Sequence, residues 1–403
     1  MHLNIKLYPW FQACRSLLFW QAIWFLYFQQ ELSASEAILL AAVFDIASAV
    51  LEVPSGVLSD RFGRRLTLML AMLASCAGCL LIANGQSFVA FAAGQTLLGA
   101  GVAFASGTDS ALLYDSLLET GQESDVATHE VRAWRFTFSA LAISASAGGF
   151  LYMRDPSDAF VATSLAAVVG MILAYRFQEP ARSRKTQSRR HIAGDIATIA
   201  GYLRQPALTW LFTLAVAMYV FSHVPFVFGQ PFINQAMEQV GFAAETPVVS
   251  GAVTTAMMVI SVFAGWFTLR VEASIGTTRI LLLALSMQIA LISILMTSVH
   301  PIAITFLLFR MVPDAFAKPF IIAGIQPRID SAFRATYLSL QSLCGRFGLA
   351  ATLLVASYFA SDDGLLPQST LQTILLFYVC AGLFVLTFLS LTTRYIRRLS
   401  SDA

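Results

Sequence analysis

Ionisable residues inside long apolar stretches are the feature of this sequence that could do chemistry. Arg310, Asp314 and Lys318 recur every four residues, which places them on one face of a helix. Asp45 and Glu52 are seven residues apart and also share a helical face. An ionised side chain at the centre of a bilayer costs roughly 2.5–3.5 kcal/mol on insertion scales. If these stretches cross a membrane, such charges are candidates for substrate binding, proton transfer or gating.

The basic stripe at 310–318 allows two interpretations. Its members can neutralise one another within a packed helix, or they can line a substrate cavity, which is the interpretation we favour. At helical spacing Arg310 pairs with Asp314, leaving Lys318 as excess positive charge. Pro313 and Pro319 are expected to interrupt this helix and to free carbonyls that must face protein or a water-filled cavity.

A carboxylate that couples transport to protons should be embedded in the membrane, face a cavity and bind its proton more tightly than in water. Asp45, Glu52 and Asp314 are the candidates. Permanent pairing with an arginine, such as Arg346 in a later apolar stretch, would instead keep a carboxylate ionised. The sequence leaves both possibilities open.

The composition shows which solvent surrounds these residues. The chain has 403 residues, of which 57% are hydrophobic and 12% are charged, whereas a soluble domain has about 25% charged residues. This excludes a soluble enzyme, a disordered chain and a nucleic-acid-binding domain, and it disfavours an outer-membrane barrel. The main partner of the chain is therefore a lipid bilayer. The net charge of +2 gives no reason to expect nucleic acid as a partner.

Twelve apolar stretches are long enough to cross a bilayer as helices. They are 7–28, 37–58, 66–84, 88–110, 131–153, 159–177, 206–228, 247–269, 277–297, 301–325, 332–360 and 371–391. Pro225, Gly229 and Pro231 further predict a broken seventh helix with an outer gate, next to a packed His223.

The distribution of arginine and lysine sets the orientation. Basic residues gather on alternate joints and at both ends of the chain, whereas the opposite joints are acidic, with Arg154 as their only basic residue. Both termini are therefore predicted to be cytoplasmic. A basic segment around 182–190 separates six spans from six. We predict an N-terminal six-helix bundle at 1–180, a cytoplasmic linker with an amphipathic helix at 181–205, and a C-terminal six-helix bundle at 206–403.

The joint between the second and third spans carries a motif. It reads Gly56-Val57-Leu58-Ser59-Asp60-Arg61-Phe62-Gly63-Arg64-Arg65 and resembles the signature loop of the major facilitator superfamily, G-x-L-[AS]-D-R-x-G-R-[RK]. The glycines permit a tight turn and close helix approach. The resemblance implies an all-α polytopic membrane protein whose loop latches the two bundles on the cytoplasmic side. It also implies that Asp60 caps the helix beginning near Ala332, and that Asp109 or Asp115 receives Arg61 or Arg64.

The same resemblance assigns the other intramembrane charges. In this superfamily the first, fourth, seventh and tenth helices line the cavity, and the second and eleventh helices face each other. Arg346 would therefore form a state-dependent bridge with Asp45 or Glu52. The predicted substrate-binding residues are Arg15, Trp24, Arg310, Asp314, Phe316 and Lys318.

The function predicted from these features is secondary transport of a small organic molecule by alternating access. We favour proton-linked efflux of drug-like or amphipathic compounds by an antiporter, because Glu52-Val53-Pro54-Ser55-Gly56 resembles a pattern of superfamily exporters. The alternative is transport, including uptake, of an anionic or zwitterionic metabolite or siderophore. The basic stripe favours it, as does the fifth-span sequence at 144–149, which lacks the antiporter proline.

Other classes of protein are disfavoured. The sequence contains no nucleotide-binding loop, H-E-x-x-H or G-x-S-x-G motif, so we expect neither an enzyme nor a bound metal or cofactor. The expected protein is a monomeric, multi-pass protein of the inner (cytoplasmic) membrane that binds a small-molecule substrate and protons.

Overall fold

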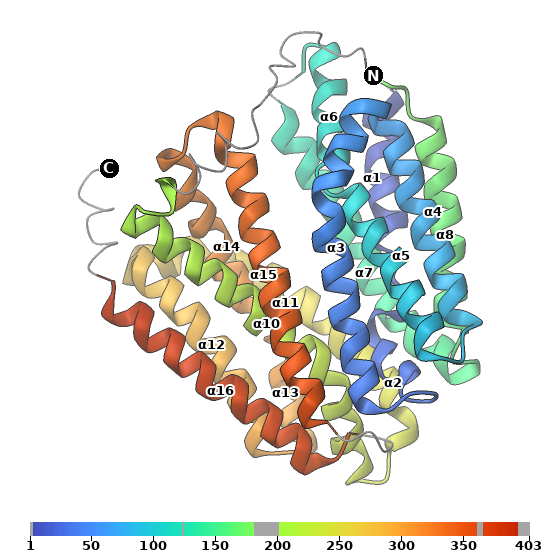
Figure 1. Cartoon of the computed structure of the whole chain (residues 1–403), viewed down its shortest axis with the longest axis vertical. Coiled ribbons are helices and arrows are strands. Elements are labelled where there is room, and N and C mark those ends of the chain that lie inside the picture. The colour runs from blue at the N-terminus through green and yellow to red at the C-terminus, as the bar shows by residue number, and fades with distance from the viewer. Residues whose placement is uncertain (1–2, 123–124, 181–200, 361–365, 394–403) are drawn as a thin grey trace. The chain divides into compact units, whose positions relative to one another are not determined.

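The computed structural model describes residues 3–122, 125–180, 201–360 and 366–393, and every regular element in these ranges is a helix (Figure 1). Ten helices among them are long and apolar enough to span a membrane. The predicted first and tenth spans are also helical, but each is divided into shorter pieces. The protein is therefore an all-α polytopic membrane protein, as the composition predicts.

The helices match the twelve predicted spans in order. The first span contains α1 (Leu3–Ser16), η1 (Phe19–Ala22) and α2 (Trp24–Phe28), and the next five contain α3 (Ala34–Phe62), α4 (Arg64–Ala83), α5 (Phe88–Ala105) with α6 (Thr108–Glu119), α7 (Val126–Arg154) and α8 (Asp158–Arg176). The later spans contain α10 (Pro206–Glu238), η3 (Ala243–Glu245) with α11 (Thr246–Ile275), α12 (Thr277–Thr297), η4 (Pro301–Ala303) with α13 (Ile304–Leu307) and α14 (Val312–Ile325), η5 (Gln326–Arg328) with α15 (Ser331–Phe359), and α16 (Gln368–Leu391).

The chain forms two compact units, which are described separately. Unit 1 consists of Met1–Ser183, Phe242–Thr255 and Leu353–Leu365, and unit 2 consists of Arg184–Gly241, Ala256–Thr352 and Leu366–Ala403. The division at 180 and 205 inferred from the sequence stays a prediction. Most of the predicted linker helix, at 181–200, lies outside the described residues, as do Asp362, Asp363 and the terminal arginines.

Close helix packing builds the core of unit 1. Helix α5 lies between α3 and α4, and α8 packs on α4 (Figure 1). A Cβ added to Gly99 would stand 2.8 Å from the carbonyl of Phe44 in α3, and one added to Gly94 would stand 3.0 Å from that of Gly78 in α4. Small residues therefore allow the backbones to approach, which is how helices associate in lipid.

Close helix packing also involves the fifth span in unit 1. Gly148 of α7 abuts the carbonyl of Phe19, leaving no room for a side chain there. The hydroxyls of Ser146 and Thr255 lie 2.7 Å apart, and Thr255 donates to the carbonyl of Ala142 at 2.9 Å. The small residues at 144–149 thus support packing without the proline of antiporter signatures.

Unit 2 is organised around α12. This helix packs against α10, α14 and α16. A Cβ on Gly382 of α16 would stand 2.8 Å from the Ile289 side chain of α12. Two buried aromatic donors tie helix ends together: Trp210 Nε1 donates to the carbonyl of Leu389 at 2.9 Å, and Tyr337 Oη to that of Leu208 at 3.0 Å.

Helix breaks occur in different places from those predicted. The seventh span is one continuous helix with Pro225 and Pro231 inside it, so the predicted break is wrong. Both prolines are buried, and packed neighbours let a membrane helix tolerate the missing backbone bonds. The tenth span does break, but at residues 308–311, so that Pro313 lies in the first turn of α14 whereas Pro319 lies further inside it.

Candidate functional site

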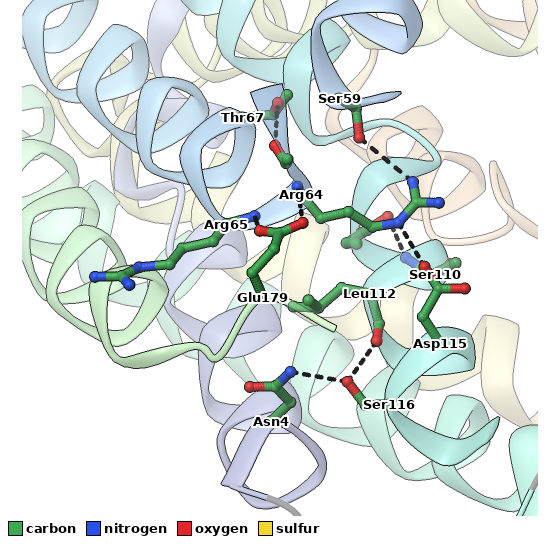
Figure 2. Close-up of polar contacts among 12 residues, drawn as sticks. Asn4, Ser59, Arg64, Arg65, Thr67, Ser110, Leu112, Asp115, Ser116 and Glu179 are labelled. Carbon is green, nitrogen blue, oxygen red and sulfur yellow. Dashed lines mark hydrogen bonds and ion pairs between the residues drawn. The ribbon is translucent and has the colours of Figure 1, made fainter. Parts of the chain in front are cut away.

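The motif loop is organised by a carboxylate that the sequence analysis did not single out. Glu179 follows α8, and its two carboxylate oxygens accept hydrogen bonds from the backbone amides of Arg64 at 2.8 Å and Arg65 at 2.9 Å (Figure 2). These are the first amides of α4 and lack partners within the helix. A negative charge at this end also complements the helix dipole. Glu179 therefore acts as the N-terminal cap of α4.

Gly63 makes this cap possible. Its φ of 107° is rarely adopted by residues with a side chain. A Cβ at this position would also stand 2.8 Å from the Glu179 carboxylate. By contrast, no atom of unit 1 lies within 4 Å of a Cβ added to Gly56. The predicted tight turn is thus confirmed at Gly63, whereas Gly56 needs no close approach within this unit.

The arginines of the motif have separate partners. Arg64 Nε lies 2.7 Å from Asp115 Oδ2 (Figure 2), which confirms one of the predicted pairings. The Arg65 guanidinium lies 4.7 Å from the centre of the Tyr175 ring, and that of Arg61 lies 5.6 Å from the Phe62 ring. The side chain of Asp60 and that of Ala332 lie outside what the structure describes, so the predicted cap on the eleventh helix stays a prediction.

Asn4 ties this region to the first helix. Its amide nitrogen donates to Ser116 Oγ and to the carbonyl of Gln178, both at 2.8 Å, and its side-chain oxygen accepts from the backbone amide of Gln178 at 2.8 Å. The segment that carries Glu179 is therefore fixed on both sides. The sequence offered one signal for the role of Glu179, which is an acidic residue at the end of the sixth span, directly before the basic segment around 182–190.

Unit 1 contains a cavity of about 450 Å³ whose lining includes Arg15, Trp20, Ser75, Asp109 and Thr163. Arg15 Nη1 lies 3.0 Å from Asp109 Oδ2. Asp109 is therefore not the partner of Arg61 or Arg64, which corrects its assignment to the cytoplasmic latch. The physical reason is that Asp109 and Asp115 are six residues apart, which places them on different faces of α6.

Asp109 lies at a break in the fourth span. Helix α5 ends at Ala105, Gly107 adopts the left-handed conformation with a φ of 72°, and Asp109 is in the first turn of α6. Arg15 is in the last turn of α1, directly before the first span breaks. Each charge thus lies at the helix end whose dipole favours it. Phe19, beyond the break in the first span, donates its backbone amide to Thr163 Oγ1 at 3.0 Å.

A second cavity, of about 290 Å³, lies in unit 2, and its lining includes Tyr219, His223, Asp314, Lys318 and Gln341. Lys318 Nζ lies 3.1 Å from Asp314 Oδ2. The pairing of Arg310 with Asp314 is therefore wrong. The break at 308–311 removes the helical spacing between those two residues, whereas Asp314 and Lys318 share the continuous helix α14.

Aromatic residues accompany the basic side chains of unit 2. Arg310 Nε lies 3.2 Å from Met257 Sδ, and its guanidinium lies 5.2 Å from the centre of the Phe226 ring. The Arg346 guanidinium lies 5.9 Å from the Tyr219 ring. His223 stacks on Tyr219 and shares a 2.7 Å hydrogen bond with its carbonyl. A carbonyl only accepts, so Nδ1 of His223 carries the proton.

The remaining predicted site residues are placed as follows. Trp24 is buried against Phe25 and Phe28, and Trp20 rather than Trp24 lines the cavity of unit 1. Phe316 is half-buried in α14. Asp45 is buried in α3 and Glu52 is half-buried. Their proposed bridge to Arg346 stays a prediction. No cluster of potential metal ligands occurs among the described residues.

Most of the chain matches one protein family. Residues 10–353 match the model of the Major Facilitator Superfamily. The chain belongs to this superfamily. Its fold is accordingly the superfamily's, with twelve helices in two bundles. Comparison with the curated proteins found no match.

Solved transporters share this superfamily fold. The nucleoside transporter NupG is similar over 98% of this chain and 100% of its own, with a TM-score of 0.78 and 13% identity. The POT family transporter PepTSo is similar over 98% of both chains, with a TM-score of 0.75 and 13% identity. A D-xylose–proton symporter is similar over 96% of both chains, with a TM-score of 0.73 and 14% identity. At such identities the likeness concerns the fold, and together with the family it identifies a transporter rather than an enzyme.

Proposed function

We propose that this superfamily member is a secondary active transporter that moves a small amphipathic organic molecule by alternating access. The observation that carries the proposal is an apolar cavity with an ion pair on its wall in each unit. Arg15 pairs with Asp109 in unit 1, and Lys318 pairs with Asp314 in unit 2. Both pairs lie beside helix breaks, where membrane transporters commonly bind substrates and coupling ions.

The proposed coupling ion is the proton and the proposed direction is efflux. Asp45 and Asp314 are buried carboxylates in membrane-spanning segments, and Glu52 shares a helix with Asp45. Moving a proton on or off such a group changes the charge that must be accommodated in lipid. This supports an antiporter of the inner membrane in which one of these carboxylates releases its proton when substrate binds.

The proposed roles of the other residues follow the two cavities and the loop. Arg15, Arg310, Asp314 and Lys318 contribute to substrate binding, together with Phe316, and Trp20 takes the role predicted for Trp24 because it lines the cavity of unit 1. Gly63, Arg64, Arg65 and Asp115 hold the cytoplasmic loop in shape, with Gly56, Asp60, Arg61 and Arg346 completing the gate. We propose that the protein acts as a monomer. Its molecular mass, measured in detergent solution, tests this proposal.

A second candidate is transport of an anionic or zwitterionic metabolite. It is supported by the positions of Arg310 and Arg346, which lie over the rings of Phe226 and Tyr219 on α10. Weakly hydrated guanidinium groups next to aromatic faces suit a planar carboxylate. The substrate's charge therefore separates the two candidates.

The decisive experiment reconstitutes the purified protein into vesicles with an imposed pH gradient. The panel consists of ethidium as an amphipathic cation and salicylate as an aromatic carboxylate, each measured in both gradient directions. Gradient-dependent movement of ethidium supports efflux of amphipathic compounds, and movement of salicylate alone supports the second candidate. If a broader panel of neutral, cationic and anionic compounds shows no protein-dependent movement under any gradient, secondary transport is wrong.

A further inference from the structure

Asp109 has a set of hydrogen-bonding partners that can serve either of its protonation states. The side chain is only 5% exposed. Its Oδ2 accepts from Gln12 Nε2 at 2.8 Å and lies 3.0 Å from Arg15 Nη1, and its Oδ1 accepts from the backbone amide of Ser110 at 2.8 Å. In this arrangement both oxygens of the Asp109 carboxyl group face hydrogen-bond donors.

Gln12 is the unusual member of this set. It is 6% exposed, and its carbonyl oxygen is buried without a hydrogen-bond partner among the described residues. An unpaired buried acceptor is unfavourable, because it has lost its hydrogen bonds to water without gaining a partner. Turning the amide over would present this oxygen to Asp109, where it can accept a hydrogen bond only if the carboxyl group carries a proton.

Tyr8 makes that reversal possible. Its hydroxyl accepts from Gln12 Nε2 at 2.9 Å and lies 3.4 Å from Glu130 Oε1. A hydroxyl both donates and accepts, so it can donate to the Gln12 oxygen once the amide has turned. A protonated Asp109 and the Tyr8 hydroxyl would then both donate to the Gln12 oxygen. The amide nitrogen would take the place at which that oxygen now has no partner, so either orientation leaves one end of the Gln12 amide unpaired among the described residues.

The equivalent set in unit 2 lacks this freedom. Gln288 also contacts the cavity carboxylate, because its Nε2 lies 3.3 Å from Asp314 Oδ1. The same nitrogen donates to the backbone carbonyl of Met218 at 3.3 Å. A carbonyl cannot donate, so a reversed Gln288 would bring two acceptors together. The amide of Gln288 is therefore held in the orientation in which its nitrogen donates to Asp314 and to the Met218 carbonyl.

The charged and titratable groups around Asp109 are few. Helix α6 packs against α1, α4, α5 and α7. From α1 it meets Tyr8 and the cation Arg15, and Glu130 of α7 reaches it through Tyr8. Arg64 of α4 pairs with Asp115 of α6, and α5 contains no charged residue.

We propose that Asp109, with Gln12 and Tyr8, is the proton-binding site of unit 1. One proton adds to Oδ2 of the carboxylate, the amide of Gln12 turns, and the Arg15–Asp109 ion pair is lost. Arg15 stays protonated and is left in the cavity with a free positive charge, which an anionic group of a substrate can bind. The inference rests on the proposed proton-linked transport and adds a coupling residue to Asp45, Glu52 and Asp314.

The test follows the carboxyl groups themselves by infrared spectroscopy during a pH titration of the full chain in lipid. The carbonyl stretch of a protonated carboxyl group in an apolar site should appear as the pH falls. Asp109→Asn is expected to remove this titrating band, whereas Asp115→Asn, which alters a half-exposed surface pair, is expected to keep it. Retention of the whole band in Asp109→Asn would overturn the proposal.

Two further variants separate the proposed site from a merely structural role. Gln12→Leu removes the amide nitrogen and the amide oxygen that would contact Asp109. Tyr8→Phe removes the hydroxyl that allows the amide to turn. Each variant should therefore change the pH at which the Asp109 band is half-developed. Unchanged midpoints in both would overturn the role of the amide. If Asp109→Asn fails to fold because Arg15 loses its partner, the double variant Arg15→Gln with Asp109→Asn removes both charges and should lack the same band.

The spectroscopic result does not depend on transport. An Asp109 band in a protein that moves no compound in vesicles would contradict the proposed function and keep the proton site. If transport is coupled to the pH gradient but Asp109→Asn leaves the band unchanged, the proposed function is supported and the proton site at Asp109 is wrong.

Discussion

At the scale of single residues, backbone conformation and carboxylate placement decide the geometry of the motif loop. Gly63 takes a φ of 107°, and Glu179 occupies the space in which a side chain at 63 would stand. The same carboxylate holds the first amides of α4. The loop therefore combines two requirements, a glycine and an acid, that lie more than a hundred residues apart in the sequence.

We predict that Gly63→Ala lowers the stability of the protein by about 1–3 kcal/mol, because alanine is strained in this backbone conformation and meets Glu179. Gly56→Ala is the matched control, because it lies in a helix with no atom of unit 1 within 4 Å of the added carbon. It should leave stability unchanged or raise it slightly. Thermal unfolding in detergent measures both variants, and equal loss in the two would contradict the prediction.

The cap itself gives a graded prediction. Glu179→Ala removes both acceptors from the α4 terminus and should lower stability by about 0.5–2 kcal/mol. Glu179→Gln keeps one acceptor and should lie between the wild type and the alanine variant. Glu238→Ala, at an exposed glutamate that ends α10, serves as the control. A Glu179→Gln variant less stable than Glu179→Ala would show that the amides are not held as described.

At the scale of elements, helix breaks position the charges. Asp109 follows the break at Gly107, Arg15 precedes the break in the first span, and Asp314 lies in the first turn of the helix after the break at 308–311. Broken helices expose terminal amides and carbonyls whose partial charges complement these residues. In each unit the ionisable residues of the cavity thus lie next to helix breaks.

The sequence predicted the spans better than the breaks. The ninth span, 277–297, coincides with α12 (Thr277–Thr297), because Gly276 and a polar segment bound a uniform apolar stretch. The first span breaks at Leu17 and Leu18, which carry no local signal for a break. The break depends on Thr163 and Gly148 from other helices. Conversely, Pro225 and Pro231 carry a strong local signal, but packing keeps α10 continuous.

The candidate site shows the same limit. The resemblance to the signature loop implied that Asp109 or Asp115 would receive an arginine of the motif, and the structure pairs Arg64 with Asp115. The motif could not predict Glu179, whose role depends on how α8 ends beside α4. The pairing of Asp314 with Lys318 rather than Arg310 likewise depends on where the helix begins, and a pattern of four-residue spacing does not contain that information.

We predict that the break at Gly107 tolerates only residues that accept a left-handed backbone. Asparagine adopts this conformation more readily than alanine, and a β-branched residue adopts it least. Stability should therefore fall in the order Gly107→Asn, Gly107→Ala, Gly107→Val, with about 1–2 kcal/mol for alanine. Gly265→Ala, within α11 and in open space, is the control and should not lose stability. If Gly107→Val were the most stable of the three variants, the left-handed conformation at the break would be contradicted.

At the scale of the whole molecule, charge sets the orientation in the membrane. The inward joints and the ends carry nearly all arginines and lysines, and the outward joints carry Glu31, Asp155 and Glu245 with Arg154. Basic residues near short loops are retained on the cytoplasmic side. An even number of spans returns the chain to the side on which it began, so the same rule places both ends together.

We therefore predict cytoplasmic termini and an external joint around Ser157, tested by thiol labelling of intact cells. In a background with all five native cysteines replaced, Ser157→Cys should react with a membrane-impermeant maleimide, because it lies between α7 and α8 in an exposed, hydrogen-bonded turn. Gln122→Cys, at the joint after α6, should react only after the cells are opened. The reverse pattern would invert the topology, and with it the assignment of the Gly63–Glu179 loop to the cytoplasmic side.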